Sequence, residues 1–414
     1  MANTAPRVAE EERHEAPESV DEKARQLAEK IKNSKHFIVF TGAGISTSAG
    51  IPDFRGPEGV WTLRAQGRQQ VSKGTSTLQA IPTPTHMALV ELQNRGLLKY
   101  LVSQNCDGLH RRSGILPDRI SELHGNSNRE YCRDCDKEYI RDFRAVATYE
   151  KTVRDHRTGR KCALCGGVLL DSIINFGESL WEEPLERARD NAKKADLCLA
   201  LGSSLTVSPA NEIPETVGRK KRGRSSAAGQ LVICNLQSTP IDELSAIRVW
   251  SATDDLMTRV MKKLDIPIPV FILRRRLIIE FETTGDERHQ IAVRGIDVDG
   301  TPATFLQSVK LEHNRRVARS EPFTVNFRGD LEIGTQLKLE LEFMGHYGEP
   351  NLHIDFEYDG EKRSQASYLL EYDPATGEWR MTKPNDEDMP GPQEVAAGVA
   401  SVERELSVID LTED

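Results

Sequence analysis

The 414-residue sequence has no run of 18 consecutive apolar residues, which excludes an ordinary transmembrane helix, and we expect no membrane partner. The N-terminus lacks the apolar stretch of a secretory signal, which argues against secretion. Cysteine is scarce and odd in number, with seven residues. This count is unlike a disulfide framework and indicates a reducing compartment.

Negative charge is concentrated at the C-terminal end, although the net charge of the chain is only −9. Residues 384–414 carry nine acidic residues and a single arginine. A composition of 38% hydrophobic and 29% charged residues is typical of a globular protein with flexible ends. We therefore expect an acidic disordered tail over residues 374–414 and a polar extension over residues 1–32 that becomes helical from residue 20.

Four short apolar runs indicate buried parallel strands. They span residues 36–40, 100–103, 196–201 and 231–234, and glycine or polar residues follow each of them. Such runs are typical of strands covered on both faces, so the pattern predicts an α/β fold with a doubly wound parallel sheet. Ligands of these folds bind at the carboxyl ends of the strands. From residue 269 to 373, segments of alternating polarity predict an appended antiparallel β-rich domain.

A glycine-rich loop, Thr41-Gly-Ala-Gly-Ile-Ser-Thr47, follows the first apolar run. Gly42 and Gly44 allow the backbone to approach a pyrophosphate, and a following helix would supply N–H donors. Thr47 replaces the third glycine of a dinucleotide fingerprint, so an ordinary strand-to-helix turn remains the alternative. Side chains that can hydrogen-bond a ribose or a carboxamide follow the other runs: Gln104, Asn105, Ser203, Ser204, Asn235 and Gln237.

Two Cys-x-x-Cys pairs are the strongest local signal. Each pair places two sulfurs on one tight turn, and four thiolates fit a tetrahedral Zn²⁺ shell. The 26 residues between the pairs are enough for a small lobe. Because four thiolates leave no coordination position open for water, we expect one structural zinc ion. Its ligands would be Cys132, Cys135, Cys162 and Cys165.

His124 lies in a Leu-His-Gly turn eight residues before the first cysteine. A histidine can accept a proton near neutral pH, but an isolated one is commonly a surface or core residue. His36, His86 and His110 compete for a catalytic role. The position between the predicted sheet and the zinc lobe favours His124.

An ordered set of motifs resembles the sirtuin family over residues 33–268. The motifs are Gly42-Ala-Gly-Ile-Ser46, Gly50-Ile-Pro-Asp-Phe-Arg55, Gln104-Asn-Cys-Asp-Gly-Leu-His110, Leu123-His-Gly125, the four cysteines, Phe176-Gly-Glu178, Leu201-Gly-Ser-Ser204 and Asn235-Leu-Gln237. Residues 56–62, Cys106 and the spacing of the cysteine pairs most resemble the class IV branch and its nucleolar members.

The resemblance implies a Rossmann-like catalytic domain over residues 33–268 with a zinc module inserted at about 125–172. It implies NAD-dependent removal of acyl groups from lysines of nuclear proteins such as histones, yielding nicotinamide, O-acyl-ADP-ribose and free lysine. By the resemblance, His124 is the general base, and Asn105 and Asp107 hold the nicotinamide and the reactive conformer. The peptide would lie against residues 176–178. Positions matching NAD contacts are Gly42, Ala43, Gly44, Thr47, Phe54, Arg55, Trp61, Gln104, Asn105, Asp107, His124, Gly202, Ser203, Ser204, Asn235, Gln237 and Thr253.

Two further segments concern location and partners. The resemblance implies the nucleus, and the nucleolus within it. Arg219-Lys-Lys-Arg222 predicts a nuclear import signal or a chromatin or nucleic-acid contact, although a solvated loop has the same composition. Residues 408–414 resemble a SUMO-interaction motif, in which aliphatic residues add a strand to a partner's sheet.

Two other function classes fit parts of the sequence. A hydride-transferring dehydrogenase fits the glycine loop, but the third glycine is absent. A non-catalytic chromatin scaffold fits the zinc lobe, the basic loop and the tail, but the complete set of catalytic motifs argues against it. The sequence does not choose between deacylation and mono-ADP-ribosyl transfer, nor among acyl chains.

Overall fold

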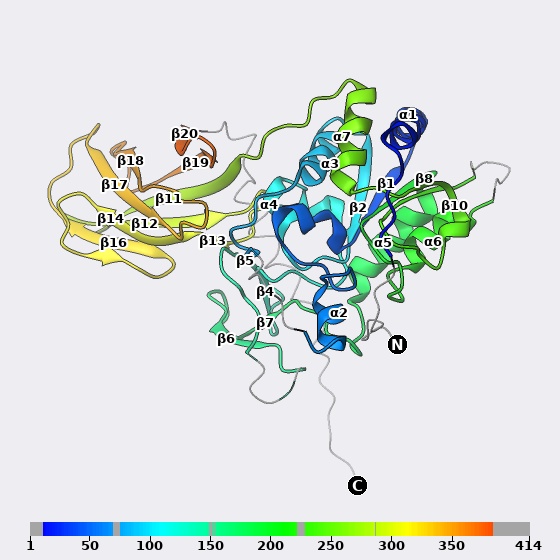
Figure 1. Ribbon diagram of the computed structural model, residues 1–414. Coiled ribbons are helices and arrows are strands. Elements are labelled where there is room, and N and C mark those ends of the chain that lie inside the picture. Colours follow the sequence, from blue (N-terminus) through cyan, green and yellow to red (C-terminus); the bar gives the residue numbers. More distant parts are fainter. Residues whose placement is uncertain are drawn as a thin grey trace, which may run out of the picture. The chain divides into compact units, whose positions relative to one another are not determined.

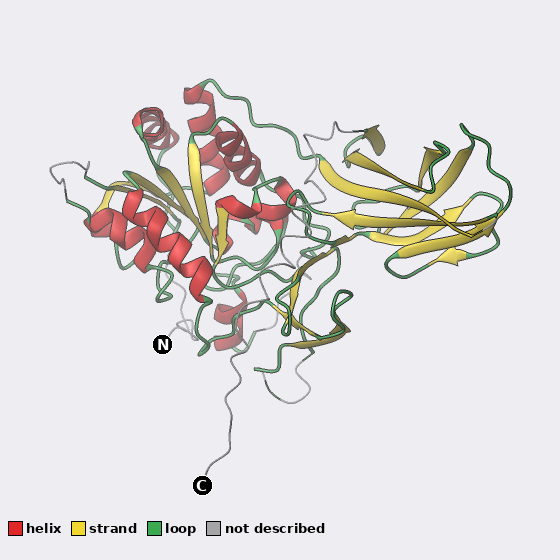
Figure 2. Cartoon of the chain, turned by 180° about the vertical axis from the view of Figure 1, so that it is seen from behind, coloured by secondary structure: helices red, strands yellow, loops and turns green. Residues whose placement is uncertain are grey.

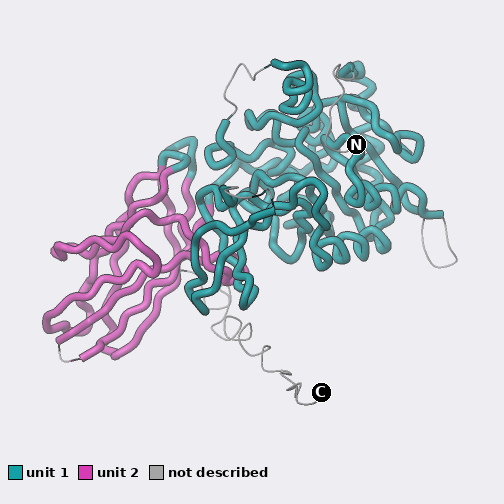
Figure 3. The backbone as a smooth tube through the Cα atoms, turned by 90° about the horizontal axis from the view of Figure 1, so that it is seen from below, with its two compact units in different colours: residues 1–273, 346–348, 373–377 teal, residues 274–345, 349–372, 378–414 magenta. Residues whose placement is uncertain are grey.

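The computed structural model of the chain describes residues 11–68, 75–148, 152, 154–221, 228–285 and 287–383. The chain divides into two compact units (Figure 3). The first consists of residues 1–273 with 346–348 and 373–377, and the second of residues 274–345, 349–372 and 378–414. Within the described ranges, no helix is both long and apolar enough to cross a bilayer.

A six-stranded parallel sheet forms the centre of the first unit (Figure 1). Its strands are β1 (Phe37–Thr41), β2 (Leu98–Ser103), β3 (Ile120–Glu122), β8 (Leu197–Leu201), β9 (Gln230–Cys234) and β10 (Ser245–Val249). They lie in the order β10-β9-β8-β1-β2-β3, and all neighbouring pairs are parallel. The strand order reverses between β1 and β8, which is the switch point of a doubly wound fold. The predicted fold class is therefore confirmed.

Helices cover both faces of this sheet (Figure 2). One face carries α1 (Pro17–Asn33), α3 (Pro84–Asn94) and α7 (Thr253–Leu264), and the other carries α5 (Glu182–Lys194) and α6 (Glu212–Arg219). Two short helices, α2 (Val60–Ala65) and α4 (Leu109–Ser113), follow β1 and β2. The helix predicted from residue 20 is confirmed and begins slightly earlier, at Pro17.

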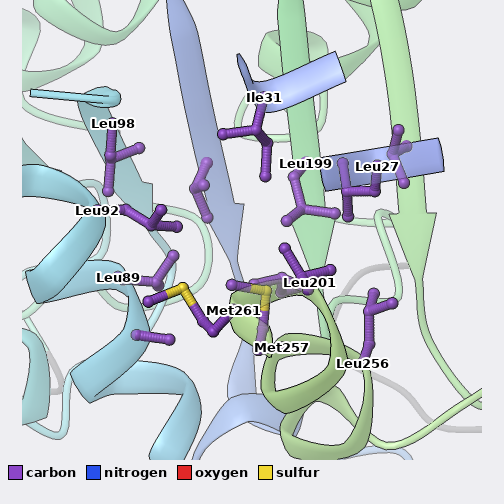
Figure 4. Close-up of a cluster of buried hydrophobic side chains, with 14 of the residues drawn as sticks. Leu27, Ile31, Leu89, Leu92, Leu98, Leu199, Leu201, Leu256, Met257 and Met261 are labelled. Atoms are coloured by element: carbon purple, nitrogen blue, oxygen red, sulfur yellow. The ribbon is translucent and has the colours of Figure 1, made fainter. Parts of the chain in front are cut away.

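The continuous apolar runs result from burial on both faces. Phe37 and Val39 of β1 pack into the cluster under α1, α3 and α7, whereas Ile38 and Phe40 pack into the cluster under α5 and α6. Because successive side chains of a strand point to opposite faces, both faces of β1 are apolar from Phe37 to Phe40. Figure 4 shows side chains of the first cluster, in which Met257 and Met261 of α7 lie among Leu199 and Leu201 of β8 and Leu89 and Leu92 of α3.

The zinc lobe predicted between the cysteine pairs forms a small antiparallel sheet in the first unit. Its strands are β4 (Arg129–Cys132), β5 (Glu138–Arg141), β6 (Arg157–Lys161) and β7 (Val168–Asp171). β4 pairs with β5 and β7, and β7 also pairs with β6. The lobe returns to the larger sheet through residues 172–180.

The second unit contains two antiparallel sheets, as the alternating pattern predicts. One has the order β16-β12-β11-β19-β20 and the other β15-β14-β17-β18. The strands are β11 (Leu273–Gly285), β12 (Arg288–Ile296), β14 (Leu306–Leu311), β15 (Val317–Ala318), β16 (Phe323–Arg328), β17 (Gln336–Phe343), β18 (Leu352–Glu357), β19 (Arg363–Asp373) and β20 (Glu378–Thr382), with the short β13 (Ala303–Thr304).

Strand β20 corrects one expectation, because it lies within the segment predicted to be a disordered tail. Its residues are mostly exposed, so they lack the apolar alternation that would have indicated a strand. Residues 1–10, 222–224 of the basic loop and 384–414, which include the SUMO-like motif, lie outside the described residues.

Candidate functional site

The glycine loop and the loop after β8 cross at the switch point of the sheet. The Gly44 N–H donates to the Gly202 carbonyl oxygen at 2.9 Å, and the Gly42 N–H donates to Leu201 O at 3.0 Å. A Cβ atom on Gly44 would lie 2.7 Å from Gly202 Cα, and Gly202 has a φ of +59°. Two backbones approach this closely only because neither residue carries a side chain. The crossing leaves the loop backbone accessible from the carboxyl edge of the sheet.

No α-helix begins directly at the glycine loop, which corrects the expectation of a helix N-terminus there. Two 3₁₀ turns occupy this part of the chain: η1 (Ala43–Ile45) lies within the loop, and η2 (Thr47–Ala49) begins at its last residue. The second turn ends at Gly50, which has a left-handed φ of +83°. Backbone N–H groups of the loop remain available to an anion, but a helix dipole does not add to them.

Side chains after β2 join the glycine loop to the loop after β8. Gln104 Nε2 donates to Ser203 Oγ at 2.6 Å. Asn105 Nδ2 donates to the Gly42 carbonyl oxygen at 3.1 Å. These bonds fix the three loops that the sequence analysis placed at neighbouring strand ends, as expected for carboxyl ends of adjacent parallel strands.

A cavity of about 630 Å³ opens where these loops meet. Its size lies within the usual range for small-molecule sites. The lining comes from the glycine loop, the end of β2, the return from the zinc lobe and the loops after β8 and β9. The lining residues are Gly42, Ala43, Gly44, Asp53, Phe54, Arg55, Gly56, Trp61, Gln104, Asn105, Cys106, His124, Ile173, Ile174, Asn175, Phe176, Gly177, Glu178, Leu180, Gly202, Ser203, Ser204, Val207, Ser208, Pro209, Asn235 and Gln237.

His124 lines the cavity in a defined tautomer. Its Nδ1 lies 3.0 Å from the Gln104 carbonyl oxygen, which can only accept a hydrogen bond. Nδ1 therefore carries the proton and Nε2 keeps a free lone pair. Burial lowers the pKa of His124 below the ordinary histidine value, and the bond to Gln104 opposes this shift only in part. The neutral ring at physiological pH is the form that can act as a general base.

The three competing histidines do not line the cavity. His86 and His110 are buried against each other with ring centroids 4.8 Å apart, and burial lowers the pKa of each to about 3. His110 bonds Thr41, and His36 bonds Asn191. These rings are engaged elsewhere in the fold, so His124 is the histidine of this set that faces a ligand site.

Three predicted site residues do not line the cavity: Thr47, Asp107 and Thr253. Asp107 supports the site from behind, since its carboxylate accepts hydrogen bonds from Ser46 Oγ at 2.7 Å and from the Leu109 N–H. Thr47 turns back to Gly44 O, and Thr253 begins α7, where its hydroxyl accepts a bond from Thr85. Asp107 belongs to the segment after β2, as predicted, but its carboxylate is turned toward Ser46 and Leu109 and not into the cavity.

Three aromatic rings that contact one another in sequence line part of the cavity. The centroids of Phe54 and Trp61 lie 4.9 Å apart, and those of Trp61 and Phe176 lie 5.1 Å apart. Arg55 stacks over the Trp61 ring at 4.6 Å. Beside them, burial raises the pKa of Asp53, although the carboxylate accepts a bond from the Gly56 N–H. This wall brings a cation and flat apolar surfaces to one side of the cavity.

Sequence reasoning missed several lining residues. Ile173, Ile174 and residues 207–209 belong to no recognised motif, and they reach the cavity only through the tertiary fold; Cys106 lies within a motif but was not assigned to the site. The Cys106 thiol donates to the His124 carbonyl oxygen at 3.1 Å, and the Ile174 N–H bonds the same oxygen. The segment that returns from the zinc lobe is thus attached directly to the backbone of the cavity histidine.

The four predicted cysteines converge at the end of the zinc lobe. Their sulfur atoms all lie within 4.8 Å of one another, and all four are free thiols. Such a set of soft donors in two knuckles fits a tetrahedral Zn²⁺ ion. None of the four lines the cavity, so a metal held there would brace the lobe without meeting a ligand in the cavity.

Comparison with known proteins places these features in a family. The model described as "Sir2 family" matches residues 68–209. NAD-dependent protein deacetylase SRT1 of Arabidopsis thaliana is 38% identical over 351 residues, covering 78% of this chain and 72% of the relative. Human NAD-dependent protein deacetylase sirtuin-7 is 43% identical over 267 residues, covering 63% of this chain and 65% of the relative. A solved structure, "Sir2-p53 peptide-NAD+", aligns with 57% of this chain at 30% identity and a TM-score of 0.43. The identity and coverage of the relatives confirm the resemblance seen in the motifs, and the chain belongs to the Sir2 family, the sirtuins.

Proposed function

We propose that this protein is an NAD-dependent protein-lysine deacylase, with deacetylation as its first expected activity. The observation that carries the proposal is the neutral Nε2 of His124, which lines a cavity between a nucleotide-type glycine loop and the return from the zinc lobe. The names of the relatives, NAD-dependent protein deacetylases, support the same activity.

The residues around the cavity suit NAD⁺ as the co-substrate. Backbone N–H groups of the loop at Gly42 and Gly44 are placed for a pyrophosphate, and Arg55 can neutralise its charge. Asn235 and Gln237 follow β9 and can hydrogen-bond the adenosine ribose. Asn105, held by Gly42 O and backed by Asp107, is placed to orient the nicotinamide end.

The chemistry follows from the position of the base. Bound NAD⁺ would supply the ribose carbon that the acyl oxygen attacks as nicotinamide leaves with the bonding electron pair. His124 Nε2 would accept the proton of a ribose hydroxyl, which would make the hydroxyl oxygen the nucleophile toward the acyl carbon. The lysine amine departs after gaining a proton, and water supplies the remaining oxygen, so that the products are nicotinamide, O-acyl-ADP-ribose and free lysine.

Apolar side chains of the cavity would limit the access of water once NAD⁺ and peptide are bound. The rings of Phe54, Trp61 and Phe176 line one side, with Phe54 and Phe176 each 45% exposed before binding, and Ile173 and Ile174 line the return from the zinc lobe. A positively charged ribose carbon reacts with any water that reaches it, so an apolar wall favours transfer to the acyl oxygen. The acyl-lysine side chain would enter along residues 173–178.

The direct test is a mass-spectrometric assay with zinc-loaded protein, NAD⁺ and a panel of acylated histone peptides, with and without nucleosomes. We expect acyl loss from at least one peptide, with nicotinamide released only when that peptide is present. Reduction of the nicotinamide ring, seen as new absorbance, would instead indicate the dehydrogenase alternative. Nicotinamide release with peptide ADP-ribosylation would indicate ADP-ribosyl transfer.

The pH profile provides an independent check on the base. Because burial lowers the pKa of His124, its neutral form persists below the ordinary histidine value of about 6.5. We expect the acidic limb of kcat/KM, which reports the free enzyme, to fall only at a pH below that value. An acidic limb at or above about 6.5 would contradict a buried, neutral His124 as the base.

Nuclear proteins such as histones are the proposed substrates, and the nucleus, including the nucleolus, is the proposed location. Similarity to sirtuin-7 and the basic residues at 219–222 support this assignment. We also propose that the basic loop contacts nucleic acid and that residues 408–414 bind SUMO or a SUMO-modified partner. Fluorescence microscopy of the tagged chain with and without charge-reversed residues 219–222 tests the location.

A further inference from the structure

One imidazole in the zinc lobe bonds two carboxylates at once. His156 Nδ1 lies 2.7 Å from Asp171 Oδ1, and His156 Nε2 lies 3.0 Å from Glu178 Oε1. His156 immediately precedes β6, Asp171 ends β7, and Glu178 lines the cavity. The same ring thus contacts both ends of the segment 171–178, whose middle forms one wall of the cavity.

The carboxylates define the charge of the ring. An ionised carboxylate can only accept hydrogen bonds, so both ring nitrogens donate and the ring is an imidazolium. Burial lowers the pKa of His156, but the bonds to Asp171 and Glu178 outweigh burial and raise it above the ordinary value. The hydrogen bond between His156 and Glu178 also lowers the pKa of Glu178, whereas burial of this carboxylate raises it. The hydrogen-bond geometry and the directions of the two pKa shifts therefore both indicate a charged His156 ring.

Each carboxylate also organises the backbone beside it. Asp171 accepts bonds from the N–H groups of Ala147 at 2.6 Å and Ile173 at 3.2 Å. Glu178 Oε2 accepts the Asn175 N–H at 2.7 Å, and the Glu178 N–H returns to Asn175 O at 3.1 Å. The turn at 175–178, which presents Phe176 to the cavity, is thus closed from both sides and fixed to the lobe by His156.

We propose that His156 is a positioning residue that clamps the segment 171–178 in the shape that receives the acyl-lysine side chain. The inference rests on the proposed function, because the segment is assigned there to the peptide. The Ile174 N–H also bonds the carbonyl oxygen of His124 at 3.1 Å. Loosening the clamp would therefore disturb peptide binding first, while His124 keeps its own bond to Gln104.

The clamp depends on pH in a defined direction. A raised pKa means that the bridge is complete below that pKa and is lost as the pH rises through it, when one nitrogen stops donating. Among the residues that the structure describes, Asp171 and Glu178 are the ionisable groups bonded to the ring. Nearby Arg157 pairs with Asp155 at 2.6 Å, and Tyr131, whose pKa is raised to about 12, stays neutral. We therefore expect that any weakening of peptide binding at alkaline pH results from deprotonation of the His156 ring.

The test compares His156→Gln with the wild type, using the full zinc-loaded chain. Glutamine can donate to one carboxylate but cannot bridge both as a cation. We expect the peptide KM of the variant at pH 7 to rise about tenfold, the effect of one charge-assisted hydrogen bond, with kcat, NAD⁺ KM and zinc content unchanged. Above the ordinary histidine pKa of about 6.5, the wild-type peptide KM should rise as the pH passes through the raised pKa of His156, and the variant should lack this dependence. His313→Gln, at an exposed histidine of the second unit, is the matched control.

Other outcomes overturn the proposal. An unchanged peptide KM across this pH range would show that the bridge does not position the segment. If His156→Gln also had a lower kcat, a higher NAD⁺ KM and a lower zinc content, His156 would stabilise the fold in general and would not specifically position the peptide segment. Hydrogen exchange of amides 173–178 gives a reading that does not need turnover. If the wild type deacylates no peptide, the proposed function is wrong. The clamp is then tested by hydrogen exchange alone: faster exchange of amides 173–178 in His156→Gln would support it, and unchanged exchange would contradict it.

Discussion

Replacing His124 by alanine should lower the kcat for deacylation by about 10²–10⁴-fold, the usual contribution of a general base. The variant removes Nε2, which is placed to take the proton of the ribose hydroxyl. The loops that would hold NAD⁺ are fixed by other bonds, such as Gln104 to Ser203 and Asn105 to Gly42. Calorimetric NAD⁺ affinity should therefore stay close to the wild-type value while single-turnover rates fall.

Two further variants make this expectation specific. In His124→Gln the amide can still donate to Gln104 O but cannot act as a base, so its rate should fall nearly as far. His36→Gln changes a histidine that bonds Asn191 outside the cavity, and it should leave the rate unchanged. A His124→Ala variant that keeps most of the wild-type rate with NAD⁺ bound would assign the base to another group.

Replacing Cys162 by serine should release zinc and unfold the lobe of β4–β7. The buried apolar cluster of this lobe consists of Cys132, Tyr139, Cys162 and Leu169, so half of it is made of the ligands themselves. Zinc binding to such sites is worth roughly 10–16 kcal/mol in small peptides. This is about the whole stability of an ordinary domain, and the described residues of the lobe form no comparable core that could replace it.

The measurement is zinc content by mass spectrometry together with hydrogen exchange across both sheets of the first unit. We expect Cys162→Ser to hold less than one zinc ion per chain and to exchange freely over residues 129–171, with protection of β1 and β8 retained. Cys106→Ser is the matched control, because Cys106 lines the cavity and lies outside the quartet. Full zinc occupancy in Cys162→Ser would show that the quartet is misassigned.

The parallel sheet could be predicted because its strands must be apolar on both faces. Phe37 to Phe40 are buried alternately on opposite sides, and an unbroken apolar run of this length suits a strand covered by helices on each side. Strand β20 could not be predicted, since four of its five residues are exposed and Trp379 packs on Phe343, a partner distant in sequence. The two 3₁₀ turns over residues 43–49 could not be distinguished from the start of an α-helix in the sequence, because the left-handed conformation of Gly50 that ends the second turn is evident only in the fold.

The candidate site was predictable where strand ends or metal spacing define it. Asn105, Ser203 and Gln237 follow strands, and the cysteine quartet has a spacing that few other functions require. Thr253 does not line the cavity, because the N-terminus of α7 turns its hydroxyl to Thr85. His156 had no local signal, since both of its carboxylate partners come from later parts of the chain and meet it only in the folded lobe.

The most direct test of the proposed chemistry is the product balance of a single turnover, with enzyme in excess over an acylated peptide and NAD⁺ present. Each acyl group lost from lysine should appear on ADP-ribose, accompanied by one nicotinamide, and His124→Ala should suppress formation of the acyl-ADP-ribose. Release of the acyl group as a free acid without nicotinamide, or unchanged product formation in His124→Ala, would contradict a histidine base acting on a ribose hydroxyl.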